Sequence, residues 1–165
     1  LDVTGLAYQV VLNLKFLSHG TLISRNLEKS KEFYQNFFGL EVVRTSPISL
    51  MIRMGGNHVY AVVENKKHDS EMNYLFHNGL DVDTDKQVDE AHLVATNQAS
   101  KWGLTKISKP RAQHGTYSFY FWDSDFNCWE ILSNPDRGYM WIFDKGDQEG
   151  IGHMDKNYDR SEVNK

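Results

Sequence analysis

The order of predicted elements constrains the fold of this chain more than any single residue does. Residues 17–24 form a β-branched and apolar run that predicts a strand. Asn26 is a good N-cap for the helix that follows, and Gly39 is a good residue to end it. Three strand-like runs come next, at residues 40–45, 48–54 and 58–65. This part of the chain therefore predicts the order βαβββ.

The same order begins again in the second half of the chain. A strand at residues 73–82 and a helix at residues 84–102 are followed by three strand-like runs, at residues 104–110, 116–123 and 128–132. His19 and His77 occupy matching places on the two opening strands, as expected for an internal repeat. We therefore predict an α+β fold made of two βαβββ modules, at about residues 17–66 and 73–133.

Composition and charge argue against several classes of protein. The 165 residues carry 18 basic and 22 acidic side chains, a net charge of −4, without the clustered basic surface that nucleic acid requires. Cys128 is the only cysteine, so no disulfide forms within the chain. No apolar run approaches the ~20 residues that span a bilayer, and residues 1–15 lack the basic start of a secretory signal. We expect a cytoplasmic protein that binds neither membranes nor nucleic acid.

Two segments lie outside the predicted modules. Residues 1–16 form an N-terminal extension, and residues 136–165 form a polar C-terminal extension or tail in which the periodicity is lost. Residues 140–143 are the part of this tail that we expect to pack on the body of the protein. The domain proper is predicted to span residues 17–135.

Three side chains in strand-like segments have the chemistry of metal ligands. His19 and His77 lie on the opening strands, and Glu130 lies on the last strand of the second module. Period-2 alternation places Glu130 opposite the apolar Trp129 and Ile131, so it can project into a cavity. A buried carboxylate is costly without a cation, and two imidazoles with one carboxylate suit a catalytic divalent metal such as Fe(II). We predict His19, His77 and Glu130 as the metal ligands.

Each of these residues also has an ordinary structural explanation. A lone histidine on a strand is more often a hydrogen-bonded core residue than a ligand, and a lone glutamate can be an edge charge. The functional interpretation depends on the joint placement of the three residues in matching elements.

With these positions assigned, the chain resembles the vicinal oxygen chelate superfamily of glyoxalases, bleomycin and fosfomycin resistance proteins and type I extradiol dioxygenases. The segment HGTLISRNLEKSKEFYQNFFGLEVV, which starts at His19, is similar to the opening of its first module. FHNGLDVDTDKQVDEA resembles the start of its second module, with His77 at the ligand position. FYFWDSDFNCWEIL resembles the closing segment and places Glu130 at the carboxylate position, although Ser124 and Phe126 replace the usual Pro and Gly.

The resemblance implies an open eight-stranded barrel-like cup, built from the two modules around one divalent ion. Its extradiol branch places a His and then a Tyr before the ligand Glu, and Tyr120 fits this spacing. His114 lies about one residue closer to Tyr120 than that signature has it. The branch implies an Fe(II) dioxygenase that cleaves a catechol-like aromatic diol, with His114 as acid–base catalyst and Tyr120 as a hydrogen-bond donor to the substrate.

Two other functions stay open at this stage. A glyoxalase-like isomerase or lyase, or a thiol transferase, would use Mn(II), Ni(II) or Zn(II), but the last strand of the first module has Tyr60 and Val62 where a further acid is expected. A drug-binding resistance protein without catalysis would not need the three predicted ligands. The two modules either close one cup within a chain or exchange between two chains, and we expect a homodimer.

Overall fold

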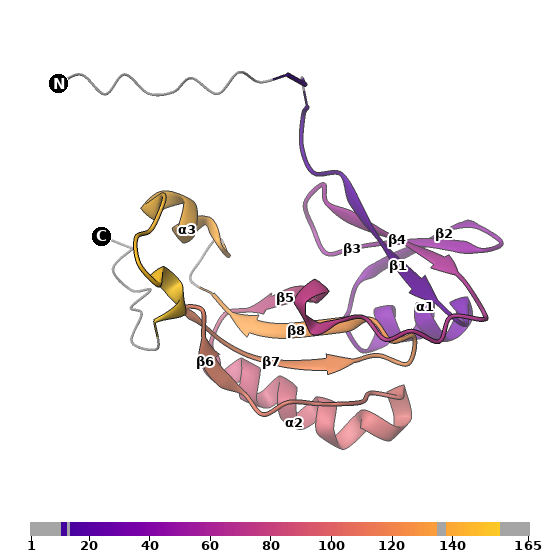
Figure 1. The fold of residues 1–165 in the computed structure, drawn as a ribbon. Helices are drawn as coiled ribbons and strands as arrows, with labels where there is room; N and C mark the ends of the chain where they lie inside the picture. Colours follow the sequence, from indigo (N-terminus) through magenta and orange to yellow (C-terminus); the bar gives the residue numbers. More distant parts are fainter. Residues whose placement is uncertain (1–10, 13, 135–137, 156–165) are drawn as a thin grey trace.

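The computed structural model describes residues 11, 12, 14–134 and 138–155. The first module comprises β1 (His19–Ser24), α1 (Leu27–Asn36), β2 (Glu41–Ser46), β3 (Ser49–Arg53) and β4 (Val59–Glu64). Its strands form the first sheet, in the order β1-β4-β3-β2, in which β1 runs parallel to β4 and the other pairs are antiparallel. Figure 1 shows this sheet with α1 on one side of it.

The second module repeats this topology. It comprises the 3-10 turn η1 (Tyr74–Phe76), β5 (Asn78–Val82), α2 (Asp85–Trp102), β6 (Arg111–Gln113), β7 (Thr116–Trp122) and β8 (Cys128–Ser133). Its strands form the second sheet, in the order β5-β8-β7-β6, with β5 parallel to β8. The α+β class and the duplicated βαβββ order are therefore confirmed. The chain continues into α3 (Met140–Lys145) and η2 (Gly152–Met154).

Two predicted strands are wrong in their extent. The run at residues 104–110 contributes only an isolated bridge between Thr105 and Trp122, and β6 begins at Arg111. Lys106 has a φ of 52°, in the left-handed region, and Pro110 has no N–H to donate to a ladder, so a regular strand cannot form there. The run at residues 73–82 begins with η1, because the Asn73 side chain accepts a hydrogen bond from the Leu75 N–H and stabilises a turn.

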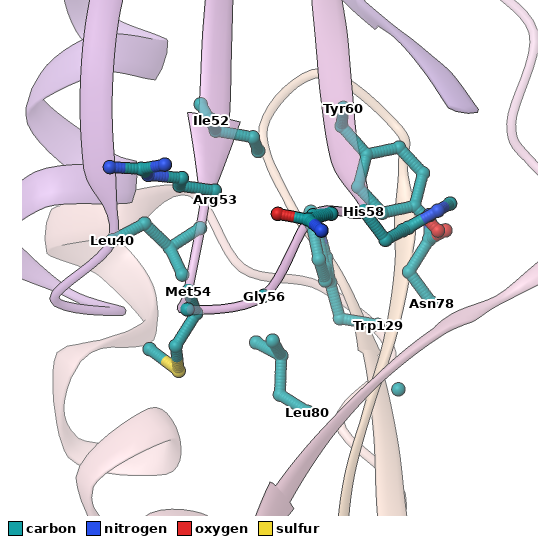
Figure 2. Close-up of a pocket in the computed structure, with 13 residues that line it drawn as sticks. Leu40, Ile52, Arg53, Met54, Gly56, His58, Tyr60, Asn78, Leu80 and Trp129 are labelled. Carbon is teal, nitrogen blue, oxygen red and sulfur yellow. The ribbon is translucent and has the colours of Figure 1, made fainter. Parts of the chain in front are cut away.

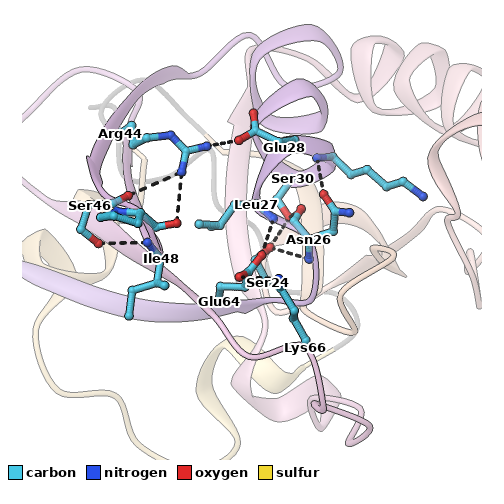
Figure 3. Close-up of polar contacts among 12 residues, drawn as sticks. Ser24, Asn26, Leu27, Glu28, Ser30, Arg44, Ser46, Ile48, Glu64 and Lys66 are labelled. Atoms are coloured by element: carbon cyan, nitrogen blue, oxygen red, sulfur yellow. Dashed lines mark hydrogen bonds and ion pairs between the residues drawn. The ribbon is translucent and has the colours of Figure 1, made fainter.

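Polar contacts fasten the start of α1 to the first sheet (Figure 3). Asn26 caps the helix, its side-chain oxygen accepting from the Lys29 N–H at 3.1 Å. The buried hydroxyls of Ser24 on β1 and Ser30 on α1 lie 2.6 Å apart. Arg44 on β2 forms an ion pair with Glu28 in the first turn of the helix. Because Ser24 faces α1, alternation along β1 directs His19 to the opposite face of the sheet.

An aromatic cluster joins α1 to the second module. Its members come from the helix and the residues just after it, from the end of α2, and from β7 and β8: Phe33, Tyr34, Phe37, Phe38, Trp102, Phe121 and Trp129. The ring centroids of Phe38 and Trp129 lie 4.8 Å apart, and those of Phe37 and Phe121 lie 6.2 Å apart. Aromatic rings of this size dominate core energetics, so α1 belongs to the cores of both modules.

A buried polar junction lies beside this cluster, in the loop between β7 and β8. Asp125 accepts hydrogen bonds from the Arg25 N–H at 2.7 Å and from the Ser30 hydroxyl. Asp123 accepts from the Trp129 indole N–H at 2.9 Å and from the backbone N–H of Asn127 at 3.0 Å. The side chains that would be costly to bury are thus hydrogen-bonded, and they fix how the two modules pack.

In the described part of the chain, no helix is both long enough and apolar enough to cross a membrane.

Asp123 provides a pH test of this packing. Burial raises the pKa of Asp123 to about 6, above the ~3.9 of an unfolded aspartate, so the folded protein binds the proton more tightly. Its contribution to stability is therefore largest below about pH 4 and declines as the pH rises through 6. The unfolding free energy of the wild type minus that of Asp123→Asn should therefore fall by about 2 kcal/mol when the pH is raised from about 4.5 to about 7.5. Urea denaturation of both proteins at the two pH values measures this difference.

The exposed Asp83, replaced by Asn, is the matched control and should show no such change relative to the wild type. An equal pH dependence for both variants would contradict the buried setting of Asp123.

Candidate metal centre

The last strand, β8, carries one carboxylate into the interior of the second module. Every residue of β8 is buried, because β5 and β7 flank it and both its faces are covered. Trp129 and Ile131 face the helices, so Glu130 lies on the opposite face with Cys128 and Leu132. The Glu130 residue is only 4% exposed, in a setting where an unpaired charge is costly.

His77 is the partner of this carboxylate. Its Nε2 lies 3.1 Å from Glu130 Oε2, and its Nδ1 donates to the Tyr74 carbonyl of η1. The second contact fixes the ring and leaves Nε2 as the atom that faces Glu130. The hydrogen bond to Glu130 raises the pKa of His77. Burial disfavours the ionised form of Glu130, but the hydrogen bonds it receives, above all from His77, lower its pKa overall.

Tyr120 and Gln113 extend this polar group across the sheet. Tyr120, in register with Glu130 on β7, donates its hydroxyl proton to that carboxylate and accepts from Gln113 Nε2 at 2.9 Å. Burial raises the pKa of Tyr120, and the Glu130 charge adds to the effect. Ser118, two residues earlier on the same face, also hydrogen-bonds Glu130. Sequence reasoning missed Ser118 and Gln113, although alternation from Tyr120 could have found Ser118.

A glycine leaves space beside Glu130. Gly79 on β5 is the register partner of Glu130. A Cβ at this position would lie 3.3 Å from Leu132 Cδ2 and 3.9 Å from Glu130 Oε2. Any larger side chain would therefore fill the volume next to the carboxylate, so the small residue keeps this part of the face open.

The C-terminal extension adds a wall at one end of this face. Trp141 of α3 is buried, and its indole N–H donates to the Asn134 side chain at 3.1 Å. Asn134 in turn donates to Asp81 of β5 at 2.9 Å. Burial raises the pKa of Tyr139 to about 12, with a further contribution from the Glu130 charge. Of residues 140–143, which were expected to pack on the body, Trp141 is buried, whereas Met140 and Phe143 are exposed. The place of Tyr139 near Glu130 was not foreseen.

His114 lies in the tight turn between β6 and β7. Its φ is 52°, and its ring contacts that of His153 from the C-terminal extension, with 5.6 Å between the centroids. Its Nδ1 is buried without a hydrogen-bond partner in the described structure. Its neighbour Gln113, on β6, hydrogen-bonds Tyr120. The acid–base role of His114 stays a prediction.

His19 does not join the other two predicted ligands within one chain. It begins β1 on the exposed face of the first sheet, where its Nδ1 lies 2.8 Å from the Ser18 hydroxyl. Among residues 11–12, 14–134 and 138–155, no three His, Cys, Asp or Glu side chains group closely enough to hold one ion. The structure thus brings together two of the three predicted ligands, His77 and Glu130.

A separate cavity lies on the other side of β8. It has a volume of about 310 Å³ and is bounded by the β3–β4 hairpin, β5 and Trp129 (Figure 2). Tyr60 and His58, whose rings lie 5.3 Å apart, line it together with Asn78. Because Trp129 and Glu130 point to opposite faces of β8, this cavity is not part of the candidate metal centre.

The fold and the paired His77 and Glu130 define a two-module protein whose second module carries a candidate metal-ligand pair. Residues 16–131 match the Glyoxalase/Bleomycin resistance protein/Dioxygenase superfamily, which is the vicinal oxygen chelate superfamily. The chain belongs to this superfamily, and the resemblance seen in the sequence is confirmed. A search of curated proteins finds no relative that matches the chain.

Solved structures share the fold at low sequence identity. A possible glyoxalase from Bacillus cereus is 19% identical, with a TM-score of 0.59 over 72% of this chain and 99% of that one. Lactoylglutathione lyase from Agrobacterium tumefaciens is 19% identical, with a TM-score of 0.54 over 78% and 100%. A variant of the fosfomycin resistance protein FosX from Listeria monocytogenes, complexed with Mn(II) and 1S,2S-dihydroxypropylphosphonic acid, is 23% identical, with a TM-score of 0.56 over 72% and 89%.

The single thiol provides a test of how closed this face is. Cys128 lies on the Glu130 side of β8 with no exposed surface, and burial raises the pKa of its thiol to about 12. Since the thiolate is the reactive form, a rise of about three units lowers its population about a thousandfold. Native protein should therefore react with Ellman's reagent at least about a thousandfold more slowly than protein unfolded in guanidinium chloride. Rapid reaction of the native state would show that this end of β8 is open to solvent.

Proposed function

We propose that this protein is a divalent-metal enzyme in which His77 and Glu130 of one chain and His19 of a second copy hold the ion. The observation that carries the proposal is the contact of Glu130 Oε2 with His77 Nε2 at 3.1 Å, in a strand that is buried on both faces. Nδ1 of His77 is already engaged by the Tyr74 carbonyl, an arrangement that orients Nε2 as a ligand.

The direction of the two sheet faces supports a shared site. Leu22 and Ser24 on β1 face α1, and Trp129 on β8 packs on residues of and just after α1. His19 and Glu130 therefore lie on the faces of their sheets that point away from the same helix. A second copy can present its first sheet to the Glu130 face, which supplies the missing imidazole and forms the expected cup between two chains.

The donors fit a catalytic divalent ion. Two imidazole nitrogens and one carboxylate oxygen leave coordination positions open for a substrate. Such an ion, when bound, supplies a Lewis acid that polarises substrate oxygens. The residues of the chain hold the site in place: Tyr120 and Ser118 hydrogen-bond Glu130, and Gln113 fixes the Tyr120 hydroxyl. Gly79 keeps a side chain off the carboxylate, since a Cβ there would lie 3.9 Å from Glu130 Oε2.

For the reaction, we propose extradiol cleavage of a catechol-like aromatic diol by an Fe(II) form of the enzyme. Tyr120 supports this proposal because its hydroxyl lies beside the candidate ligand and can hydrogen-bond a substrate oxygen. His114 is the proposed acid–base residue, and its buried Nδ1 makes no hydrogen bond in the described structure. The cytoplasmic location expected from the sequence stays a prediction.

The second candidate reaction is that of an isomerase, lyase or thiol transferase with Mn(II), Ni(II) or Zn(II). This candidate is retained because the fold is similar to that of lactoylglutathione lyase and of the FosX complex with Mn(II). A binder without catalysis is the third, and the contact between His77 and Glu130 argues against it.

A mixing experiment tests the shared metal centre. His19→Ala and Glu130→Ala chains should each bind almost no Zn(II) alone. In a mixed dimer, one site combines the intact His19 of the Glu130→Ala chain with His77 and Glu130 of the other chain. Co-refolding the two variants should therefore restore one ion per mixed dimer, measured by metal analysis after gel filtration.

Absence of metal in the mixed dimer, when wild type binds one ion per chain, would contradict a site shared between copies. Mixing His77→Ala with Glu130→Ala is the matched control. Both changes remove donors from the same half-site, so each site in that mixture stays defective.

Reconstitution with single metals separates the candidate reactions. Apoprotein loaded with Fe(II) and exposed to catechols in air should give a yellow ring-cleavage product, and the Zn(II) form should not. Tyr120→Phe should keep the metal and lose about 10–100-fold in kcat, as expected for the loss of one hydrogen-bond donor near the reaction. Turnover of lactoylglutathione or inactivation of fosfomycin by the Mn(II) or Ni(II) form, without diol cleavage, would favour the second candidate.

A further inference from the structure

Residues 11, 12 and 14–17, here called the N-terminal arm, expose an unusual run of large apolar side chains. Leu17 is 86% exposed, Leu14 is 78% exposed and Phe16 is 60% exposed. Figure 1 shows the arm projecting beyond the start of β1 and away from both sheets. Scattered apolar residues on a surface are normal, whereas a contiguous run of this kind marks an interaction site.

The base of the arm is fixed to the first sheet. The Ser18 carbonyl accepts from the Val59 N–H at 3.1 Å, and the Leu17 carbonyl lies 3.3 Å from His58 Nδ1. Leu17 and Ser18 therefore extend β1 alongside the start of β4, which ties the base of the arm to the position of His19. Period-2 alternation along this extension places Leu17 on the same face as His19.

A second exposed apolar group lies next to the other predicted imidazole ligand. The turn η1 exposes Tyr74, Leu75 and Phe76, of which Phe76 is 74% exposed. This turn is not loose: Asn73 caps it, and the Tyr74 carbonyl accepts from the His77 ring. Three large side chains are therefore held in solvent within three residues of His77.

We propose that the N-terminal arm of one copy packs on the η1 turn of a second copy and forms a clasp beside each metal centre. This inference rests on the proposed function, because His19 of one copy must approach His77 of the other. Leu17 lies two residues from His19, at most about 7 Å along an extended chain. Phe76 directly precedes His77. Shared coordination of one ion therefore brings the two apolar groups to the same end of the interface.

The clasp explains two features with one contact. The arm and the turn are the exposed apolar segments that flank the two imidazole ligands, and each is unpacked within its own chain. Burying them against each other removes both from water. The contact also joins the partner's arm to η1, whose Tyr74 carbonyl orients His77. The partner that the surface fits is thus a second copy of this chain.

A double-mutant cycle on dimer affinity tests the clasp. The arm variant is Leu14→Ser with Leu17→Ser, and the turn variant is Leu75→Ser with Phe76→Ser. Each should raise the homodimer Kd, measured by sedimentation equilibrium with and without Zn(II), by at least about tenfold. The combined variant should be little weaker than either pair alone, because both pairs remove the same contact.

Leu93→Ser with Phe143→Ser is the matched control, since these side chains are 60% and 75% exposed on α2 and α3. This control should leave the Kd within about twofold. All the replaced residues are exposed, so thermal unfolding of each variant should match the wild type at protein concentrations below the wild-type Kd, where all of them are monomeric.

Three outcomes would overturn the clasp: an unchanged Kd for the arm variant, full additivity of the arm and turn effects, or a wild type that stays monomeric. Weaker dimers of the arm and turn variants, together with mixed His19→Ala and Glu130→Ala dimers that bind no metal, would support the clasp and contradict the shared centre. A mixed dimer that binds one ion, together with an arm variant whose Kd equals that of the wild type, would support the shared metal centre and contradict the clasp.

Discussion

The packing of α1 on two modules is the constraint on which the rest of the structure depends. Its polar start is hydrogen-bonded to the first sheet through Ser24 and Ser30, and its aromatic stripe packs on Trp129 and Phe121 of the second sheet. Since one helix covers a face of each sheet, His19 and Glu130 lie on the opposite faces of their sheets. The core thus determines that His77 and Glu130 meet within one chain and that His19 does not join them there.

The element order and one ligand pair could be predicted from the sequence, because both follow from local periodicity. Alternation along β8 separates Glu130 from Trp129, and this local rule correctly predicted which side chain leaves the core. The relation between the modules could not be predicted, because the stripe of Phe33, Tyr34 and Phe37 is equally compatible with either sheet. The hydrogen bond from Gln113 to Tyr120 could not be predicted either, because it depends on the β6–β7 turn, in which His114 adopts a left-handed conformation.

Polar groups from β5, β6, β7 and the C-terminal extension converge on Glu130. Ser118 and Tyr120 from β7 hydrogen-bond it, Gln113 from β6 supports Tyr120, and Asp81 from β5 lies near enough for the Glu130 charge to raise its pKa, although burial is the larger cause. Each donor satisfies part of a charge that the interior would otherwise disfavour. The same hydrogen bonds hold the carboxylate in one orientation. Burial and orientation of Glu130 are therefore two results of a single polar network.

The position of β8 also determines where local unfolding of the second sheet begins. It is the inner strand between β5 and β7, and all six of its residues are buried, whereas β6 at the edge has three residues and one neighbour. Local fluctuations begin where few contacts are lost, so β6 should exchange its amide hydrogens early and β8 should be among the last. The Glu130 carboxylate then keeps its position while the edge strand opens transiently. The candidate ligand thus lies in the part of the sheet that unfolds last.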